Sequence, residues 1–201
     1  MPAVSIACIV EGQGEVQAMP ILLRRLVSLI NPAVYADVQR PIRQAGTHLL
    51  NAGGIETAVE LAVRGLREPG IVLIVIDSDD ICPKEVAPKL LVRAERSAAG
   101  RRPVSVVLAH REFECWFIAA AESIAGCAGL RTDLKSPESP ESIRGAKEWL
   151  RKNMLSCRAY SETIDQPSLA NKFDLNAARR APSFDKMYRE VERLCALAVA
   201  V

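Results

Sequence analysis

The chain has 201 residues, of which 49% are hydrophobic and 4% aromatic. These values argue against a disordered chain and predict one α/β core made mainly of aliphatic side chains. The formal net charge of +2 is too small to indicate a polyanionic partner by itself. No basic leader precedes the first apolar run, and no run is long enough to span a bilayer. We therefore expect a cytoplasmic protein without a membrane partner.

The first apolar run, residues 4–10, predicts a buried strand that ends at an acidic turn with the sequence Glu-Gly-Gln-Gly-Glu. Helical spacing of apolar residues after the turn predicts a helix, and Gly12 and Gly14 allow the sharp change of direction between the two. Glu11 is expected at the carboxyl edge of the sheet. Glu15 fits the same site, and it also suits the dipole at a helix start. We predict Gly12 and Gly14 as substrate-binding residues, although the turn lacks the lysine of a phosphate-binding loop.

Six consecutive apolar residues, 71–76, predict a strand buried on both faces of a parallel sheet. The strand runs directly into Asp77-Ser78-Asp79-Asp80. In an extended segment Asp77 and Asp79 point the same way, and two converging carboxylates favour a bound Mg²⁺ or Mn²⁺. The alternative is that Asp77 caps the next helix while Asp79 and Asp80 are solvated.

The other elements alternate between strands and helices. We expect a second strand near residues 33–42, helices over about 55–66 and 85–96, and a fourth strand over 104–109. The glycines before the helix at 55 offer backbone N–H groups to a phosphate, or they serve only as a turn. This alternation implies parallel pairing with right-handed crossovers, hence a three-layer α/β fold with about four strands.

The fourth strand delivers four polar residues to the same edge of the sheet: His110, Arg111, Glu112 and Glu114. If the segment stays extended, the two glutamates share a face, whereas in a helix they diverge by about 200°. We predict Glu112 and Glu114 as further metal ligands, with an acidic helix start as the alternative. Arg111 is a predicted substrate-binding residue, and His110 is expected to be a hydrogen-bonded edge residue.

The composition changes after residue 126. A polar link with prolines covers residues 136–142, and helices are expected over about 143–154 and 184–197. We divide the chain into an α/β domain, residues 1–125, and a C-terminal helical extension, residues 126–201, packed on the same domain.

Polar residues of the extension are candidates for substrate contact, namely Tyr160, Glu162, Lys172 and Arg179. Lys172 is also a predicted catalytic residue that stabilises charge in a transition state. Five basic clusters can line one face, although each is more often a solvated charge. They are Arg24-Arg25, Arg40 with Arg43, Arg101-Arg102, Arg151-Lys152 and Arg179-Arg180.

The six cysteines contain no Cys-x-x-Cys pair, so we do not expect a thiolate zinc site. Most are predicted to be small buried side chains in a reducing compartment, and Cys82, beside the acidic loop, is the one to test for reactivity. They lie at positions 8, 82, 115, 127, 157 and 195.

Several of these segments together resemble a known family. A Glu-Gly-x-x-Glu turn after the first strand, followed by Asp-x-Asp after a buried strand, is similar to the Toprim domain of topoisomerases, bacterial primases and overcoming-lysogenization-defect nucleases. Three later segments resemble a bacterial Toprim-like family among the domains of unknown function, number 4276: residues 110–119, 160–166 and 183–186. The resemblance implies a Toprim-like or Rossmann-like form of the α/β fold.

The resemblance also implies a role for the acids. In Toprim enzymes the first glutamate and the Asp-x-Asp pair serve metal-dependent phosphoryl chemistry, which points to Glu11, Asp77 and Asp79, and then to Glu15. The first predicted function is therefore a nuclease-like, Mg²⁺- or Mn²⁺-dependent phosphoryl-transfer enzyme acting on nucleic acid, with Glu11 as a catalytic residue. A companion ATPase or another protein is a further expected partner.

The second predicted function is a regulatory module that binds a nucleotide or a partner without turnover. A receiver or phosphatase that forms a phosphoaspartate is less favoured, because Glu11 stands where such a protein prefers an aspartate. A covalent topoisomerase-like mechanism has little support, since Tyr35 falls in the least certain strand.

Overall fold

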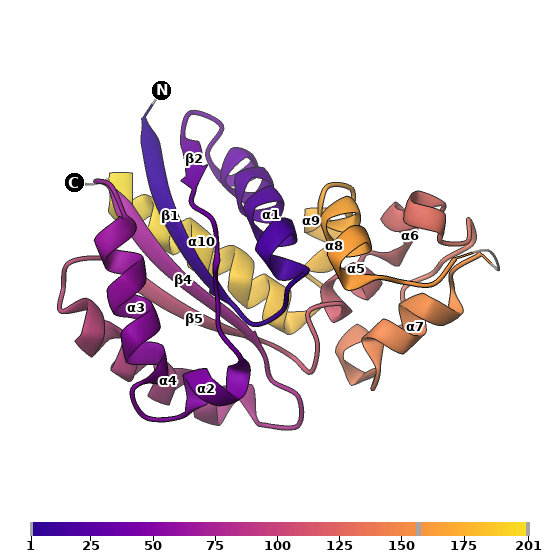
Figure 1. The fold of residues 1–201 in the computed structure, drawn as a ribbon. Coiled ribbons are helices and arrows are strands. Elements are labelled where there is room, and N and C mark those ends of the chain that lie inside the picture. The colour runs from indigo at the N-terminus through magenta and orange to yellow at the C-terminus, as the bar shows by residue number, and fades with distance from the viewer. Residues whose placement is uncertain (1, 156–157, 200–201) are drawn as a thin grey trace.

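The computed structural model describes residues 2–155 and 158–199, and it confirms an α/β fold with a parallel sheet. The strand order is β2-β1-β4-β5, with β3 also paired to β1 (Figure 1). Ile9 of β1 lies opposite Ile42 of β3 on one side and opposite Ile74 of β4 on the other. The strands are β1 (Ala3–Val10), β2 (Tyr35–Val38), β3 (Ile42–Arg43), β4 (Gly70–Asp77) and β5 (Val104–Ala109).

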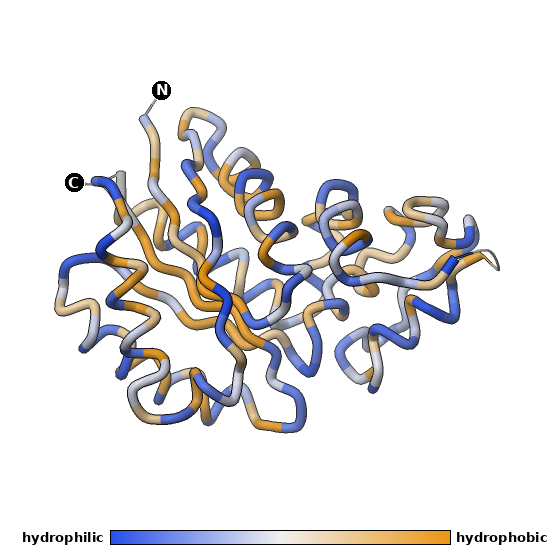
Figure 2. The backbone as a smooth tube through the Cα atoms, in the orientation of Figure 1, coloured by the Kyte–Doolittle hydropathy of each residue, from blue (hydrophilic) through white to orange (hydrophobic). Residues whose placement is uncertain are grey.

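Helices cover both faces of the sheet. Helices α1 (Glu15–Ile30) and α10 (Pro182–Val199) lie on one face, and α3 (Gly54–Gly65) and α4 (Pro83–Ala98) on the other (Figure 1). Alternate residues of each strand enter the two apolar layers, so that Leu73 packs toward α1 while its neighbours pack toward α3 and α4. Figure 2 shows the resulting concentration of hydrophobic residues along the strands.

The second strand differs from its prediction. The expected strand over 33–42 is divided into β2 and β3, and Pro41 lies immediately before β3. Proline lacks an N–H group and cannot donate a ladder hydrogen bond, which explains the interruption. Both pieces still pair with β1, so the topology is unchanged.

Most of the remaining helices form the far end of the molecule. They are α5 (Cys115–Ala119), α6 (Ala121–Ile124), α7 (Ala146–Lys152), α8 (Glu162–Ala170) and α9 (Leu175–Ala178), with 3₁₀ turns at Cys127–Gly129 and Pro140–Ser142. Helix α2 (Gly46–Leu50) instead packs beside α3 (Figure 1). Helix α7 begins later than predicted, because Gly145 before it has a φ of +72°. In the described ranges, no helix combines the length and the apolar composition that crossing a membrane requires.

Buried aromatic rings join the extension to the sheet domain. Phe113, Trp116 and Phe117 pack on Phe173 and Phe184, with neighbouring ring centroids between 4.8 and 5.5 Å apart. Such pairs contribute about 0.5–1.5 kcal/mol each beyond their buried area. Residues on both sides of the expected boundary at 125–126 therefore share one apolar cluster.

Candidate functional site

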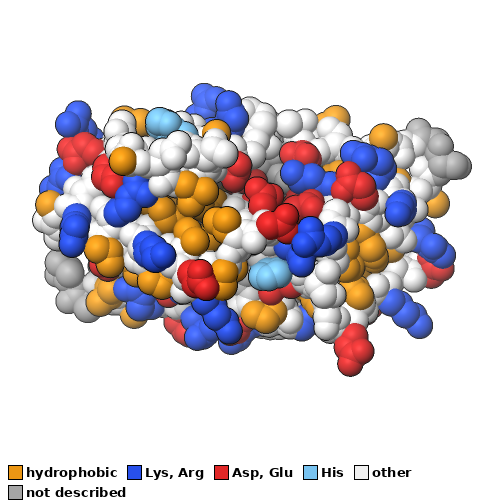
Figure 3. All heavy atoms as spheres, turned by 90° about the horizontal axis from the view of Figure 1, so that it is seen from below, with side chains coloured by type: hydrophobic (Ala, Val, Ile, Leu, Met, Phe, Trp, Pro, Cys, Tyr) orange, Lys and Arg blue, Asp and Glu red, His pale blue; other side chains and the backbone are white. Residues whose placement is uncertain are grey.

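Strands β1 and β4 meet at the point where the strand order reverses. Strand β1 continues through α1 to β2 on one side, whereas β4 continues through α4 to β5 on the other. In open α/β sheets the ligand crevice lies outside the carboxyl ends of such strands. Glu11 follows β1 and Asp77 ends β4. Figure 3, seen from the side where the strands end, shows acidic side chains gathered beside lysines and arginines.

Four acids make up what we call the acid cluster: Glu11, Glu15, Asp77 and Glu114. Glu15 is 3% exposed, and its carboxylate accepts the N–H groups of Glu11 at 3.3 Å and Gly12 at 3.2 Å. Glu15 therefore folds back over the acidic turn. Since the N–H of Gly12 is engaged by this carboxylate, that group is not directed to a ligand.

Asp77 and Glu114 complete the cluster from the two other strands. Asp77 accepts the N–H of Phe113 at 2.8 Å, which ties the end of β4 to the segment after β5. Glu114 is 0% exposed, and its Oε1 accepts from the Tyr160 hydroxyl at 3.0 Å and from Gln166 Nε2 at 2.8 Å. In the part of the chain that the structure describes, the buried Oε2 of Glu114 has no hydrogen-bond partner.

Burial of several carboxylates together disfavours their charged forms. Burial raises the pKa of Glu15 to about 7, and the charge of Glu114 adds to the effect. The pKa of Asp77 is raised by burial and then by the charges of Glu15 and Glu114. Burial likewise raises the pKa of Glu114. The acid cluster thus favours uptake of protons or of a cation.

Lys147 of α7 is a basic residue whose charge acts on Asp77 and Glu114. Burial lowers the pKa of its ammonium group, but the charges of Glu114, Glu162 and Asp77 outweigh burial and raise it. Its Nζ lies 3.3 Å from Glu162 Oε1. Sequence reasoning missed Lys147, because nothing in its local pattern separates it from the other lysines. Lys172, predicted for this role, lines a different pocket.

The extended geometry expected for residues 77–79 is wrong. Strand β4 ends at Asp77, and Asp79 adopts a left-handed φ of +46° with its N–H donated to Arg111 O at 3.1 Å. Face alternation ends where the strand ends, so Asp79 is exposed and outside the acid cluster. It lines a polar pocket of about 160 Å³ in which Asp80 lies 3.0 Å from Arg144.

The two glutamates after β5 have different surroundings. Glu114 joins the acid cluster, whereas Glu112 accepts the N–H groups of Ala146 at 3.1 Å and Lys147 at 3.2 Å. Glu112 therefore caps α7, which satisfies orphan donors at the helix start. Arg111 lines the same polar pocket as Asp79. His110 Nδ1 lies 3.1 Å from Glu141 O, as expected for a hydrogen-bonded edge residue.

Gly14 allows α8 to pack directly on the acidic turn. A Cβ at this position would lie 2.6 Å from the backbone oxygen of Glu162 and would also clash with Gln166. We expect Gly14→Ala to destabilise the protein by about 1–3 kcal/mol, measured by urea unfolding. At Gly46, the atoms nearest to an added methyl belong to the movable carboxylate of Glu11. Gly46→Ala should therefore change stability much less, and equal effects would contradict this account.

The carboxylate oxygens of the acid cluster are suitable ligands for a hard divalent cation. Carboxylates are the ligands that Mg²⁺ and Mn²⁺ prefer, and no donor among the described residues reaches the buried Oε2 of Glu114. Among residues 2–155 and 158–199, however, no three His, Cys, Asp or Glu side chains already surround a common ion position. The acid cluster is thus a candidate metal site because of its oxygen ligands and its negative charge, and it has no preformed coordination shell.

The cysteines described are free. Cys8, Cys115 and Cys195 are buried, Cys127 is half-buried and Cys82 is exposed. Burial raises the pKa of the Cys8 thiol, so this side chain behaves as a small hydrophobic residue. Cys157 lies outside the described residues.

The fold and the buried acids define an α/β protein with a polar crevice at the switch point of a parallel sheet. The chain belongs to the family of the domain of unknown function DUF4276, whose model matches residues 10–192. The predicted membership is thereby confirmed, while the wider likeness to Toprim stays a prediction. No curated protein and no solved structure matches the chain significantly.

Proposed function

We propose that the protein is a Mg²⁺- or Mn²⁺-dependent phosphoryl-transfer protein that acts on nucleic acid in the manner of a nuclease. The observation that carries the proposal is the burial of Glu15 and Glu114 beside the half-buried Asp77 at the switch point. Mutually repelling carboxylates in a low dielectric are costly unless protons or a cation neutralise them. A cytoplasmic location belongs to the same proposal, and the free cysteines are compatible with it.

Each residue of the site has a part in this proposal. Glu11, Glu15, Asp77 and Glu114 would hold the ion, which when bound polarises a phosphoryl oxygen and activates water. Tyr160 and Gln166 donate to Oε1 of Glu114 and so fix the orientation of its carboxylate.

Glu11 and Lys147 are both half-buried and reach solvent. Glu11 is half-buried, unlike the buried Glu15 and Glu114, and its accessible carboxylate supplies the general base. Lys147, whose positive charge lies beside the cluster, stabilises negative charge that develops on the phosphate. This role replaces the one predicted for Lys172.

Turnover of nucleic acid tests the proposal. The protein is incubated with linear, supercoiled and single-stranded DNA and with RNA in the presence of Mn²⁺, and metal-dependent cleavage is expected. Glu11→Gln should reduce the rate by about 100-fold or more, as loss of a general base does. Glu148→Gln, an exposed change on α7, is the matched control and should retain the rate.

Three other results would reject the assignment of an enzyme activity to this site. Cleavage that persists in Glu11→Gln, or that survives chelation of the metal, would show that the activity does not come from this site. Binding of nucleotide or nucleic acid without cleavage under all these conditions would favour the alternative function, a regulatory binding module.

A further inference from the structure

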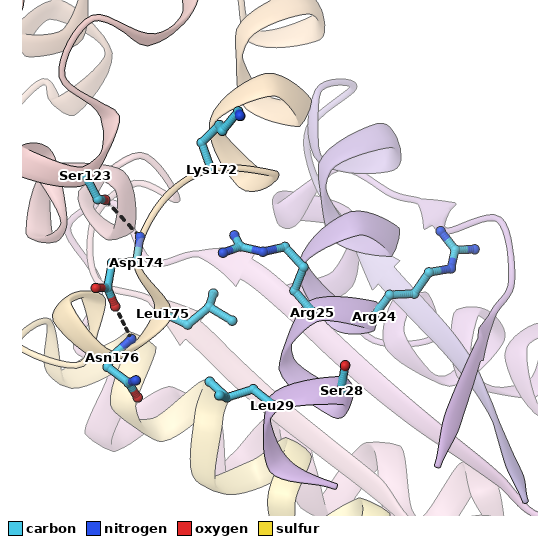
Figure 4. Close-up of a pocket in the computed structure, with 9 residues that line it drawn as sticks. All are labelled: Arg24, Arg25, Ser28, Leu29, Ser123, Lys172, Asp174, Leu175 and Asn176. Carbon is cyan, nitrogen blue, oxygen red and sulfur yellow. Dashed lines mark hydrogen bonds between the residues drawn. The ribbon is translucent and has the colours of Figure 1, made fainter. Parts of the chain in front are cut away.

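A second polar site lies away from the acid cluster, where the carboxyl-terminal half of α1 faces the connection between α8 and α9 (Figure 4). We call it the basic groove. Its volume is about 850 Å³. It is lined by Arg24, Arg25, Ser28, Leu29, Ser123, Lys172, Asp174, Leu175 and Asn176.

The groove carries an excess of positive charge. Arg25 donates to Ala170 O at 2.7 Å and to Phe173 O at 2.9 Å, which are neutral acceptors, and the charge of Asp174 compensates that of Arg25 in part. Lys172 is exposed and forms no ion pair with any residue in the described ranges. Asp174 is the only acid among the lining residues, and its Oδ1 accepts two backbone N–H groups of α9. Arg25 and Lys172 thus share the groove with one engaged carboxylate, while the side chain of Arg24, which also lines the groove, extends toward β2 (Figure 4).

Most of the other basic clusters of the chain are neutralised by ion pairs. Arg101 pairs with Glu60 at 2.5 Å, and Arg102 pairs with Glu68. The clusters at 151–152 and 179–180 likewise each contain an arginine paired with an acid. Arg24 differs, because its described side-chain contact is with a neutral group, Val38 O at 3.4 Å. The charge at the groove is therefore available to an anionic ligand.

Two helices connect the groove with the acid cluster. Helix α1 begins at Glu15 and reaches Arg24 nine residues later, a distance of about 14 Å at 1.5 Å per residue. Helix α8 packs beside α1, with Gln166 at the acid cluster and Lys172 just beyond its end (Figure 1). A span of about 14 Å corresponds to roughly four base-pair steps along a duplex at 3.4 Å per step.

We propose that the basic groove binds the sugar–phosphate backbone of a nucleic acid whose reacting phosphate lies at the acid cluster. This inference rests on the proposed function and specifies its substrate as a polymer, because a mononucleotide is too short to contact both places. Lys172 and Arg24 contact backbone phosphates. Ser28 and Asn176 offer neutral donors in the same groove. Binding through phosphates is independent of base sequence and is weakened by salt.

Fluorescence anisotropy with labelled DNA and RNA strands of about 20 nucleotides, longer than a typical single-strand footprint, tests the groove without metal. The double variant Arg24→Gln/Lys172→Gln should bind at least about 10-fold more weakly. Its slope of log affinity against log salt should fall by about 1.4, for two lost phosphate contacts. Arg25 is left intact because it caps α8. Arg151→Gln/Lys152→Gln removes the same charge from α7 and should keep wild-type affinity.

The outcomes separate this inference from the proposed function. If the double variant binds as tightly as its control and with an unchanged salt slope, the groove does not bind the sugar–phosphate backbone. The same conclusion follows if wild type binds neither the DNA nor the RNA strand. The inference would also be overturned if mononucleotides displaced the labelled strand as well as an unlabelled strand does at the same total phosphate concentration. If the double variant loses binding while wild type never cleaves, the groove assignment stands and the phosphoryl-transfer proposal fails.

Discussion

Asp77→Asn is expected to raise the melting temperature of the metal-free protein and to remove most of the stabilisation that Mg²⁺ or Mn²⁺ gives to wild type. Asparagine keeps the acceptor for the Phe113 N–H but removes a charge that repels Glu15 and Glu114. Each kcal/mol of stability gained in this way corresponds to a rise of about 2–4 °C in melting temperature for a chain of this size. Thermal unfolding at mildly alkaline pH, with and without each metal, measures both effects.

Asp79→Asn is the matched control, since Asp79 is exposed and lies outside the acid cluster. Wild type should gain about 2.7 kcal/mol at a metal concentration 100 times the dissociation constant, and Asp79→Asn should gain as much. If Asp79→Asn loses the gain while Asp77→Asn retains it, the ion binds in the pocket with Arg111, and our assignment of the acid cluster is wrong.

The stability of the metal-free protein is expected to fall as the pH rises from about 4.5 to about 7. The pKa of Glu15 is raised by burial from 4.5 to about 7 on folding. Between these values the unfolded chain has released the proton that the folded protein keeps, so rising pH favours unfolding. The shift corresponds to a loss of about 3 kcal/mol, which levels off above pH 7. Urea unfolding at a series of pH values measures this profile.

Glu15→Gln should flatten this part of the profile, because its side chain carries no titrating proton. Mg²⁺ should restore stability to wild type above about pH 7, since the ion competes with the proton for the same carboxylates. A wild-type profile that rises over this interval, or a Glu15→Gln profile that falls as steeply as wild type, would contradict the raised pKa.

The local pattern of the chain determined the architecture and part of the site. The apolar runs at 4–10 and 71–76 predict β1 and β4, since only strands covered on both faces need continuous apolar side chains. The positions of Glu11 and Asp77 follow from the same reasoning, because parallel strands bring their carboxyl ends to one edge. Both acids lie at that edge in the structure.

Tertiary packing decided which other groups surround those acids. Asp79 is separated from Asp77 by a left-handed turn, and Glu112 caps α7 while Glu114 is buried. Gln166 reaches Glu114 across 52 positions of sequence, because α8 packs on the acidic turn. Likewise, the docking of α7 and α8 places Lys147 at the acids and Lys172 at the groove. Contacts of this kind depend on how distant helices pack together, which local periodicity does not encode.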